Sequence, residues 1–160
     1  MPKVLIVVHF AGNSPNLKEI SKLSKIYKFK IIEDACHSLG GSYKNSTIGS
    51  CKYSDITVFS FHPVKSITSG EGGMVTTNSK SIAQNIKLLR THGVEKLINK
   101  KFTSNIKEGW FYYQKILGLN YRLSDIHAAL GNSQLKKLDF FIRKRNLLSL
   151  SLIHIWRCRR

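Results

Sequence analysis

The sequence predicts an α/β fold in which a mostly parallel sheet is flanked by helices. Val4–Val8 is a short apolar run of the kind found in buried parallel strands. A second apolar run lies at Ile31–Ile32, and the segment between the two runs mixes polar and apolar residues. That intervening segment carries apolar residues at helical spacing, namely Leu17, Ile20, Leu23, Ile26 and Tyr27. The order strand, amphipathic helix, strand predicts a crossover that joins two parallel strands.

Local signals place the next elements. Ser14 and Pro15 predict the start of the first helix, with Ser14 as N-cap and Pro15 in the first helical position. Turn residues between strand-prone ends at Ser42–Gly49 predict a small exposed hairpin. The β-branched and aromatic runs Ile56–Phe61 and Met74–Thr77 predict two further strands.

The second half of the chain is expected to be mainly helix and loop. Ser79 can cap a helix that continues to Arg90, and Ser124 can cap a last helix with an apolar stripe as far as Ile142. Residues Val94 to Lys115 are basic and show no period, which predicts a long loop. Loops of that length inside a domain are usually functional or mobile.

Lys65 lies in the loop between the strands predicted at Ile56–Phe61 and Met74–Thr77. Loops held by a rigid sheet often carry functional groups. A lysine that loses part of its hydration there can act as a nucleophilic amine and form a Schiff base. The chain has 26 Lys and Arg residues, so an ordinary solvated lysine is the simpler interpretation.

An acidic residue at the end of an earlier strand makes Lys65 stand out. Asp34 ends the apolar run that contains Ile31–Ile32. Ligands gather at the carboxyl ends of strands in open α/β sheets, so Asp34 and the strand ending near Phe61 are expected to face one crevice. A carboxylate, a lysine and the hydroxyl of Ser60 are the groups that a pyridoxal phosphate site needs.

Five blocks of the chain together match a known family pattern. In chain order they are Glu33–Gly40, Ser60–Lys65, Gly70–Gly73, Arg90–Gly93 and Gly118–Asp125. Through these blocks the chain resembles the DegT/StrS-type sugar aminotransferases. The resemblance is strongest to the branch that aminates a UDP-linked 4-keto sugar on the route to pseudaminic acid. In that branch a histidine, here His37, stands where most relatives carry glutamine.

The resemblance implies a domain organisation. Residues 1–146 would be the central part of the large domain of a fold-type I, aspartate aminotransferase-like transferase. The N-terminal part of that domain and a small C-terminal domain would lie outside the chain. Residues 147–160 differ abruptly in composition and resemble nothing in the family, so we expect them to be non-native and exclude them from functional reasoning.

The resemblance also implies roles for five residues. Lys65 would bond covalently to pyridoxal 5′-phosphate, and Asp34 would keep the cofactor's ring nitrogen protonated. His37 would lie beside the ring, and Ser60 would donate to the phosphate. Asn120 would reach the phosphate of the neighbouring subunit, so that a homodimer shares its sites. Otherwise His37 would be a core histidine, Ser60 an ordinary strand residue and Asn120 a turn former.

These roles imply an aminotransferase that moves an amino group from glutamate to a UDP-linked keto sugar, in bacterial surface-sugar biosynthesis. Two alternatives stay open at this point. The chain could be an inactive, truncated remnant of such an enzyme. The net charge of +17 also suggests a nucleic-acid-binding domain, although no nucleic-acid-binding signature is present and the lysines are spread along the chain.

Cysteine and histidine usage gives weaker information. The three cysteines are an odd number without paired spacing, so they support neither a disulfide framework nor a zinc site. The histidines show no pair at metal-ligand spacing, so we expect no metal. A reducing, cytoplasmic location is the natural inference, and no membrane partner is expected.

Overall fold

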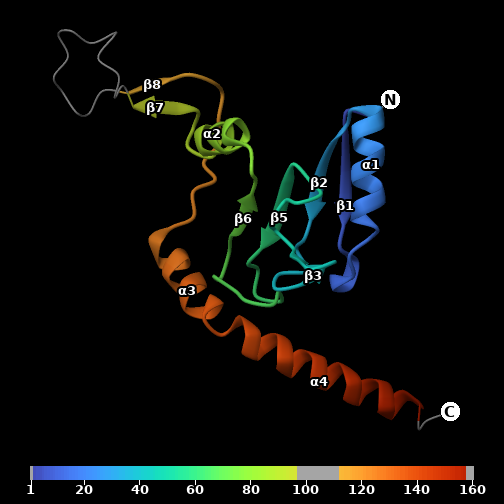
Figure 1. The fold of residues 1–160 in the computed structure, drawn as a ribbon. Helices are drawn as coiled ribbons and strands as arrows, with labels where there is room; N and C mark the ends of the chain where they lie inside the picture. Colours follow the sequence, from blue (N-terminus) through green and yellow to red (C-terminus); the bar gives the residue numbers. More distant parts are fainter. Residues whose placement is uncertain (1, 97–111, 158–160) are drawn as a thin grey trace. The chain divides into compact units, whose positions relative to one another are not determined.

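The computed structural model describes residues 2–96 and 112–157. The chain divides into two compact units. The first comprises Met1–Asn78 together with Leu123–Arg160, and the second is Ser79–Arg122. Figure 1 shows the elements of both units, which are described separately below.

A four-stranded sheet organises the first unit (Figure 1). Its strands lie in the order β1-β2-β5-β6, with bounds β1 Val4–Val8, β2 Lys30–Asp34, β5 Ile56–Ser60 and β6 Gly73–Thr76. The first three strands are parallel, and β6 returns antiparallel to β5. The predicted α/β class with a mostly parallel sheet is therefore confirmed.

Helix α1, Leu17–Tyr27, connects the parallel strands β1 and β2 after a short 3₁₀ turn, η1, at Phe10–Gly12. The predicted N-cap at Ser14 is wrong, because Asn16 occupies that position. The Ser14 hydroxyl is instead hydrogen-bonded to Nδ1 of His9 at 2.9 Å. A side-chain bond within the loop before α1 thus takes the oxygen that the capping rule would have assigned to the helix.

The predicted hairpin is present as β3, Ser42–Tyr43, and β4, Ser46–Thr47. Its two turn residues, Lys44 and Asn45, both have positive φ, at 44° and 58°. Positive φ at both central positions is the geometry that two-residue hairpins favour, because its twist matches that of the strands.

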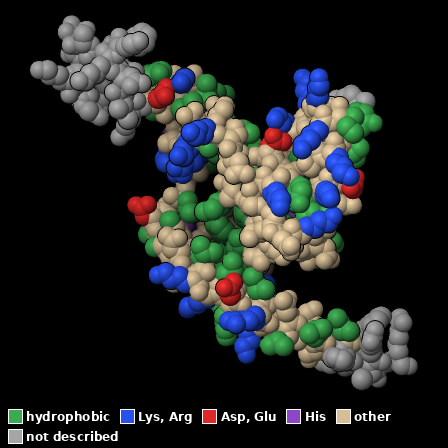
Figure 2. Space-filling model, in the orientation of Figure 1, with side chains coloured by type: hydrophobic (Ala, Val, Ile, Leu, Met, Phe, Trp, Pro, Cys, Tyr) green, Lys and Arg blue, Asp and Glu red, His purple; other side chains and the backbone are tan. Residues whose placement is uncertain are grey.

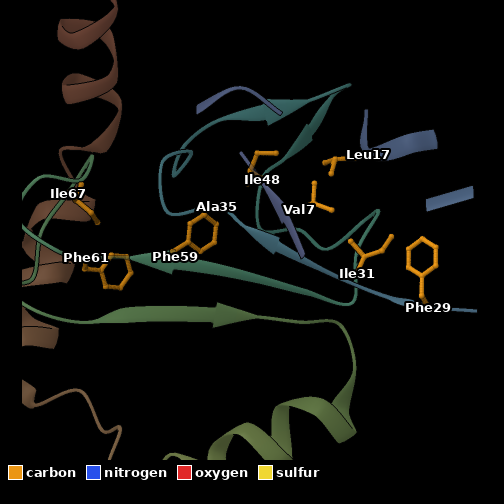
Figure 3. Close-up of a cluster of buried hydrophobic side chains, with 9 residues drawn as sticks. All are labelled: Val7, Leu17, Phe29, Ile31, Ala35, Ile48, Phe59, Phe61 and Ile67. Atoms are coloured by element: carbon orange, nitrogen blue, oxygen red, sulfur yellow. The ribbon is translucent and has the colours of Figure 1, made fainter. Parts of the chain in front are cut away.

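The hydrophobic core of the first unit lies on one face of the sheet. Figure 3 shows its nine buried side chains: Val7, Leu17, Phe29, Ile31, Ala35, Ile48, Phe59, Phe61 and Ile67. Ile31 and Leu17 are each only 2% exposed, and the strand residues among the nine share the face that α1 covers. Alternate residues of β1 point the other way, and Ile6 and Val8 are 63% and 50% exposed.

Two helices complete the first unit. Helix α3 spans Asp125–Leu135 and is capped as predicted, since the Ser124 hydroxyl accepts a hydrogen bond from the His127 N–H. Helix α4 spans Leu138–Arg157. The prediction of one continuous helix is wrong, because the helix breaks between Leu135 and Leu138. The break lets Leu138 and Phe141 pack against the core, which a straight apolar stripe did not reveal.

The second unit contains helix α2, Lys80–Leu89, and a hairpin of β7, Val94–Lys96, with β8, Tyr112–Gln114. The predicted cap of α2 is confirmed, because the Ser79 hydroxyl accepts from the N–H of Ile82. The long loop predicted from Val94 to Lys115 is wrong at both ends, where the antiparallel strands lie. Its middle, residues 97–111, falls outside the described residues.

Among the described residues, every helix is too short or too polar to cross a bilayer.

Shortening a side chain to alanine should destabilise the protein more on the buried face of the sheet than on the exposed face. Ile31→Ala should lower the free energy of unfolding by about 2–5 kcal/mol, because it leaves a cavity in the core. Ile6→Ala should cost less than about 1 kcal/mol in the same chain, since the Ile6 side chain is 63% exposed. Urea unfolding of both variants tests this, and equal losses would show that the exposed face is covered in solution.

Candidate active site

The carboxyl ends of β1, β2 and β5 meet at one edge of the sheet. The His9 N–H donates to the Asp34 carbonyl at 3.0 Å, and the Ala35 N–H donates to the Val58 carbonyl at 2.9 Å. Asp34 is paired with Val58, two residues before the end of β5 at Ser60. These backbone bonds bring Asp34 and Ser60 to the same edge, which is where ligands bind in open α/β sheets.

Asp34 is held in its ionised form. One of its carboxylate oxygens accepts a hydrogen bond from the Cys36 N–H at 3.1 Å. The thiol and the N–H of Cys36 lower the pKa of Asp34 against the opposing effect of burial, and the charges of His37 and Lys65 lower it further. Burial and the bond to Asp34 raise the pKa of the Cys36 thiol to about 11, so the thiol stays protonated and can donate. The half-buried carboxylate of Asp34 is thus favoured in its negative form.

Lys65 is half-buried in the loop that joins β5 to β6. The loop is closed by its own backbone: the Lys65 N–H donates to the His62 carbonyl at 3.0 Å, and the Ser69 N–H donates to the Phe61 carbonyl at 3.0 Å. The charge of Lys65 is one of the influences that lower the pKa of Asp34. The structure therefore places the predicted amine and carboxylate at one edge of the sheet.

Two glycines allow the loop to return into β6. Gly72 has a φ of +135°, a conformation that residues with side chains rarely adopt. A Cβ atom at Gly73 would lie 2.6 Å from the carbonyl oxygen of Phe59 in β5. The glycine pair therefore lets β6 approach β5 closely, immediately after the lysine loop.

Ser60 and His37 lie near Asp34 and Lys65. The Ser60 hydroxyl accepts a hydrogen bond from the His62 N–H at 3.3 Å, and its side chain is half-buried. His37 follows Asp34 in the chain, is exposed, and meets the Phe10 ring edge-on at 6.3 Å between centroids. The alternative interpretation of His37 as a core histidine is wrong, because its side chain is open to solvent.

Asn120 belongs to the second unit. It forms an isolated antiparallel bridge with Thr91, and the neighbouring Tyr121 N–H donates to the Arg90 carbonyl at 2.9 Å. The Asn120 side chain is exposed. The predicted contact with the phosphate of a neighbouring subunit stays a prediction, as do the cofactor-binding roles of the other four residues.

A buried polar cluster beneath the strand ends was missed by sequence reasoning. Glu33 is 3% exposed, and one of its carboxylate oxygens is 2.8 Å from Nε2 of the fully buried His9. The other oxygen accepts hydrogen bonds from the hydroxyls of Ser54 and Thr57. Strand alternation could have found Glu33, because it shares the parity of the buried Ile31 and so faces the core, whereas Asp34 faces away.

Residues 2–153 match the DegT/DnrJ/EryC1/StrS aminotransferase family. The chain belongs to this family. The match extends into the segment 147–160, whose predicted non-native origin stays a prediction, as do the predicted domain limits.

The chain is similar to longer members of the family. It is 48% identical, over 139 residues, to a UDP-4-amino-4,6-dideoxy-N-acetyl-beta-L-altrosamine transaminase of Campylobacter jejuni, covering 87% of this chain and 34% of that protein. A protein of the same name from Helicobacter pylori is 35% identical over 156 residues, covering 97% and 38% respectively. The chain thus spans about a third of the length of these relatives.

Solved structures agree with the fold assignment. The Helicobacter pylori aminotransferase PseC, described as involved in the biosynthesis of pseudoaminic acid, superposes with a TM-score of 0.84 at 36% identity, over 94% of this chain and 38% of that one. The PLP-form of a putative sugar aminotransferase from Streptococcus pneumoniae gives a TM-score of 0.70 at 26% identity, over 86% and 37%. The predicted fold, part of the large domain of a PLP-dependent transferase, is confirmed.

The buried Glu33 cluster predicts a large loss of stability when its acceptor is removed. Glu33→Ala would leave His9, Ser54 and Thr57 without their shared partner, at a cost of about 2–4 kcal/mol. Urea unfolding measures this, with the exposed Glu71→Ala as the matched control. Equal stabilities of the two variants would contradict a structural role for the cluster.

The lowered pKa of Asp34 predicts a pH effect with a definite sign. Because the folded-state pKa lies below the value of 3.8 for an unperturbed carboxyl, Asp34 contributes stability that is present above that value. The contribution is lost as the pH falls through the folded-state pKa. Asp34→Asn should therefore lose less stability on acidification than the wild type does.

Urea unfolding at a series of pH values between about 7 and 3 measures this difference. Asp139→Asn, an exposed carboxylate in α4, is the matched control. Parallel curves for the wild type and Asp34→Asn would contradict the prediction.

Proposed function

We propose that the protein containing this chain is a PLP-dependent aminotransferase that moves an amino group from glutamate to a keto group of a UDP-linked sugar, in bacterial surface-sugar biosynthesis. One observation carries the proposal: Asp34, at the carboxyl end of β2, and the loop that carries Lys65, after β5, lie at the same edge of a parallel sheet. Family membership and the names of the relatives support the reaction and the substrate class. A cytoplasmic location and a homodimer are part of the same proposal.

The donor set fits the cofactor. Bound pyridoxal phosphate supplies an electron-accepting pyridinium ring. A carboxylate suits the ring nitrogen only if it stays ionised, which is the state that the surroundings of Asp34 favour. The Ser60 hydroxyl lies at the end of β5 and could donate to the phosphate. His37, exposed beside Asp34, is free to approach a ring from one side.

Lys65 would have two duties. Its amine would bond to the cofactor when no substrate is present. Once an amino substrate has released Lys65, Nζ would take the proton from the substrate carbon that bears the nitrogen and deliver it to the C4′ carbon of the cofactor. The nearby negative charge of Asp34 and the closed loop around residue 65 would hold that amine in position.

The overall exchange is balanced without an outside oxidant or reductant. Glutamate would give up its amino group and leave as 2-oxoglutarate, and the keto sugar would exchange its oxygen for that amino group.

Asn120 would contact the phosphate at the neighbouring subunit's site, so that each active site of the homodimer uses residues from both subunits.

The nucleic-acid alternative is not proposed. On the face shown in Figure 2, Lys and Arg side chains are spread over several elements and form no single patch. The other alternative, an inactive and truncated remnant of such an enzyme, concerns only the activity of this chain on its own. Since the chain spans about a third of its relatives, we expect weak cofactor binding and little or no transamination by these 160 residues alone.

Covalent trapping tests the proposal on the purified chain. After incubation with pyridoxal phosphate and reduction with borohydride, mass spectrometry of peptides should find Lys65 modified at lower cofactor concentration than the other lysines. Lys65→Ala should abolish the corresponding visible absorbance. Lys22→Ala, a lysine with a 60% exposed side chain, should leave it unchanged.

Asp34→Asn should weaken the trapped binding several-fold, because a neutral amide does not stabilise a protonated ring nitrogen. The proposal is wrong if Lys65 is modified no faster than the surface lysines. A separate assay tests the reaction itself: amino transfer from glutamate to a UDP-linked keto sugar is measured with a protein that spans the full length of the relatives.

A further inference from the structure

Helix α4 contacts two segments of the proposed site. One is the segment that follows Asp34, and the other is the loop that carries Lys65. Ile142 and Leu138 pack against Gly40, in the segment that follows Asp34. A Cβ atom at Gly40 would lie 2.2 Å from Cδ1 of Ile142 and 3.3 Å from Cδ2 of Leu138. The helix therefore rests directly on the backbone of this segment, and the φ of +81° at residue 40 favours glycine there.

One turn further along α4, Arg145 reaches the lysine loop. Its Nη2 donates a hydrogen bond of 2.9 Å to the backbone carbonyl of Lys65, eighty residues earlier in the sequence. Leu138, Ile142 and Arg145 are spaced i, i+4 and i+7, which places them on one face of the helix. One stripe of α4 therefore contacts both loops.

The surroundings of this hydrogen bond restrict the helix further. Phe141 packs against the core that contains Ile67 of the lysine loop, whose position Figure 3 shows. A cavity of about 220 Å³ is lined on one side by Pro63 and residues 65–68 of the loop, and on the other by Gln134, Phe141, Lys144 and Arg145. Arg145 thus lines the same hollow as the lysine loop and donates across to its backbone.

We propose that Arg145 is a positioning residue that fixes the direction of the Lys65 side chain. The proposal rests on the function proposed for Lys65. The peptide group is planar, so holding the Lys65 carbonyl fixes the plane of the Lys65–Ser66 peptide. That plane, together with the bond from the Lys65 N–H to His62, sets the direction in which the side chain leaves the backbone. Because α4 also rests on Gly40, it couples the loop of Lys65 to the segment after Asp34.

Arginine suits this task better than lysine. A guanidinium has several N–H donors in a rigid plane, whereas an ammonium group is a single rotating point charge on a flexible stem. Arg145→Lys is therefore expected to restore part of the effect, and Arg145→Ala to lose it. Arg143, exposed on the same helix two residues away, offers a matched control at equal charge change.

The first measurement needs no cofactor. Hydrogen exchange, followed by mass spectrometry of peptides from the purified chain, should show residues 62–70 exchanging about five- to tenfold faster in Arg145→Ala. Arg145→Lys should lie between Arg145→Ala and the wild type, and Arg143→Ala should match the wild type. Peptides from β2 should exchange at one rate in all four proteins, which separates a local effect from a loss of global stability.

The second measurement follows the chemistry of Lys65. The rate of borohydride-trapped modification by pyridoxal phosphate is recorded against pH for each protein, by the fraction of Lys65 modified. Arg145→Ala should lower the rate at Lys65 and shift its pH profile, while the rates at surface lysines stay constant. Arg145→Lys should recover part of both changes.

The outcomes separate the two proposals. If wild-type Lys65 is modified no faster than surface lysines, the proposed function fails, and hydrogen exchange still tests the contact. If exchange of residues 62–70 in Arg145→Ala equals that in Arg143→Ala, Arg145 does not position the loop. A faster exchange with an unchanged pH profile at Lys65 would also overturn the inference, because the loop would then move without affecting the amine.

Discussion

The central position of β2 between two parallel neighbours is the constraint on which the first unit depends. Pairing on both sides fixes the register of Glu33 and Asp34 against β1 and β5. Successive strand residues point to opposite faces, so these two adjacent acids serve different ends. Glu33 faces the core and gathers His9, Ser54 and Thr57. Asp34 faces the other way, beside Cys36 and within electrostatic reach of Lys65. A slip of one residue would exchange the two faces.

The lysine loop depends on that same sheet. Because β6 runs antiparallel to β5, the chain must reverse direction within the segment that carries Lys65. Gly73 lets the returning strand approach the Phe59 carbonyl, and the backbone bonds of residues 61–72 close the loop. Helix α4, which packs on the core through Leu138 and Phe141, adds a contact from a distant part of the chain. Strand pairing thus determines where the loop begins and ends, and helix packing determines how its middle is held.

The sequence was sufficient for features that depend on local periodicity. The apolar runs at β1 and β5, and the caps at Ser79 and Ser124, follow rules that act within a few residues. It was insufficient where the path of the chain decides which groups meet. The Ser14 hydroxyl binds His9 in the loop before α1 instead of capping the helix, and the break between α3 and α4 accompanies packing on the core.

The candidate site divides in the same way. Asp34 and Lys65 could be singled out because each lies next to a strand end that the pattern identifies. The partners of Glu33 could not, since His9, Ser54 and Thr57 come together only through the strand pairing. The contact of Arg145 with Lys65 joins residues eighty positions apart, and no local sequence pattern predicts it.

The exposure of β1 has a practical consequence. This strand is at the edge of the four-stranded sheet, and its five residues include no charge, proline or glycine. Three of them, Val4, Ile6 and Val8, present about half or more of their surface to solvent. An unpaired apolar edge of this kind is a template for aggregation into intermolecular sheets. Purified preparations of the chain are therefore best kept dilute and cold, and a lysine introduced at an outward position of β1 would act as a gatekeeper against fibre growth.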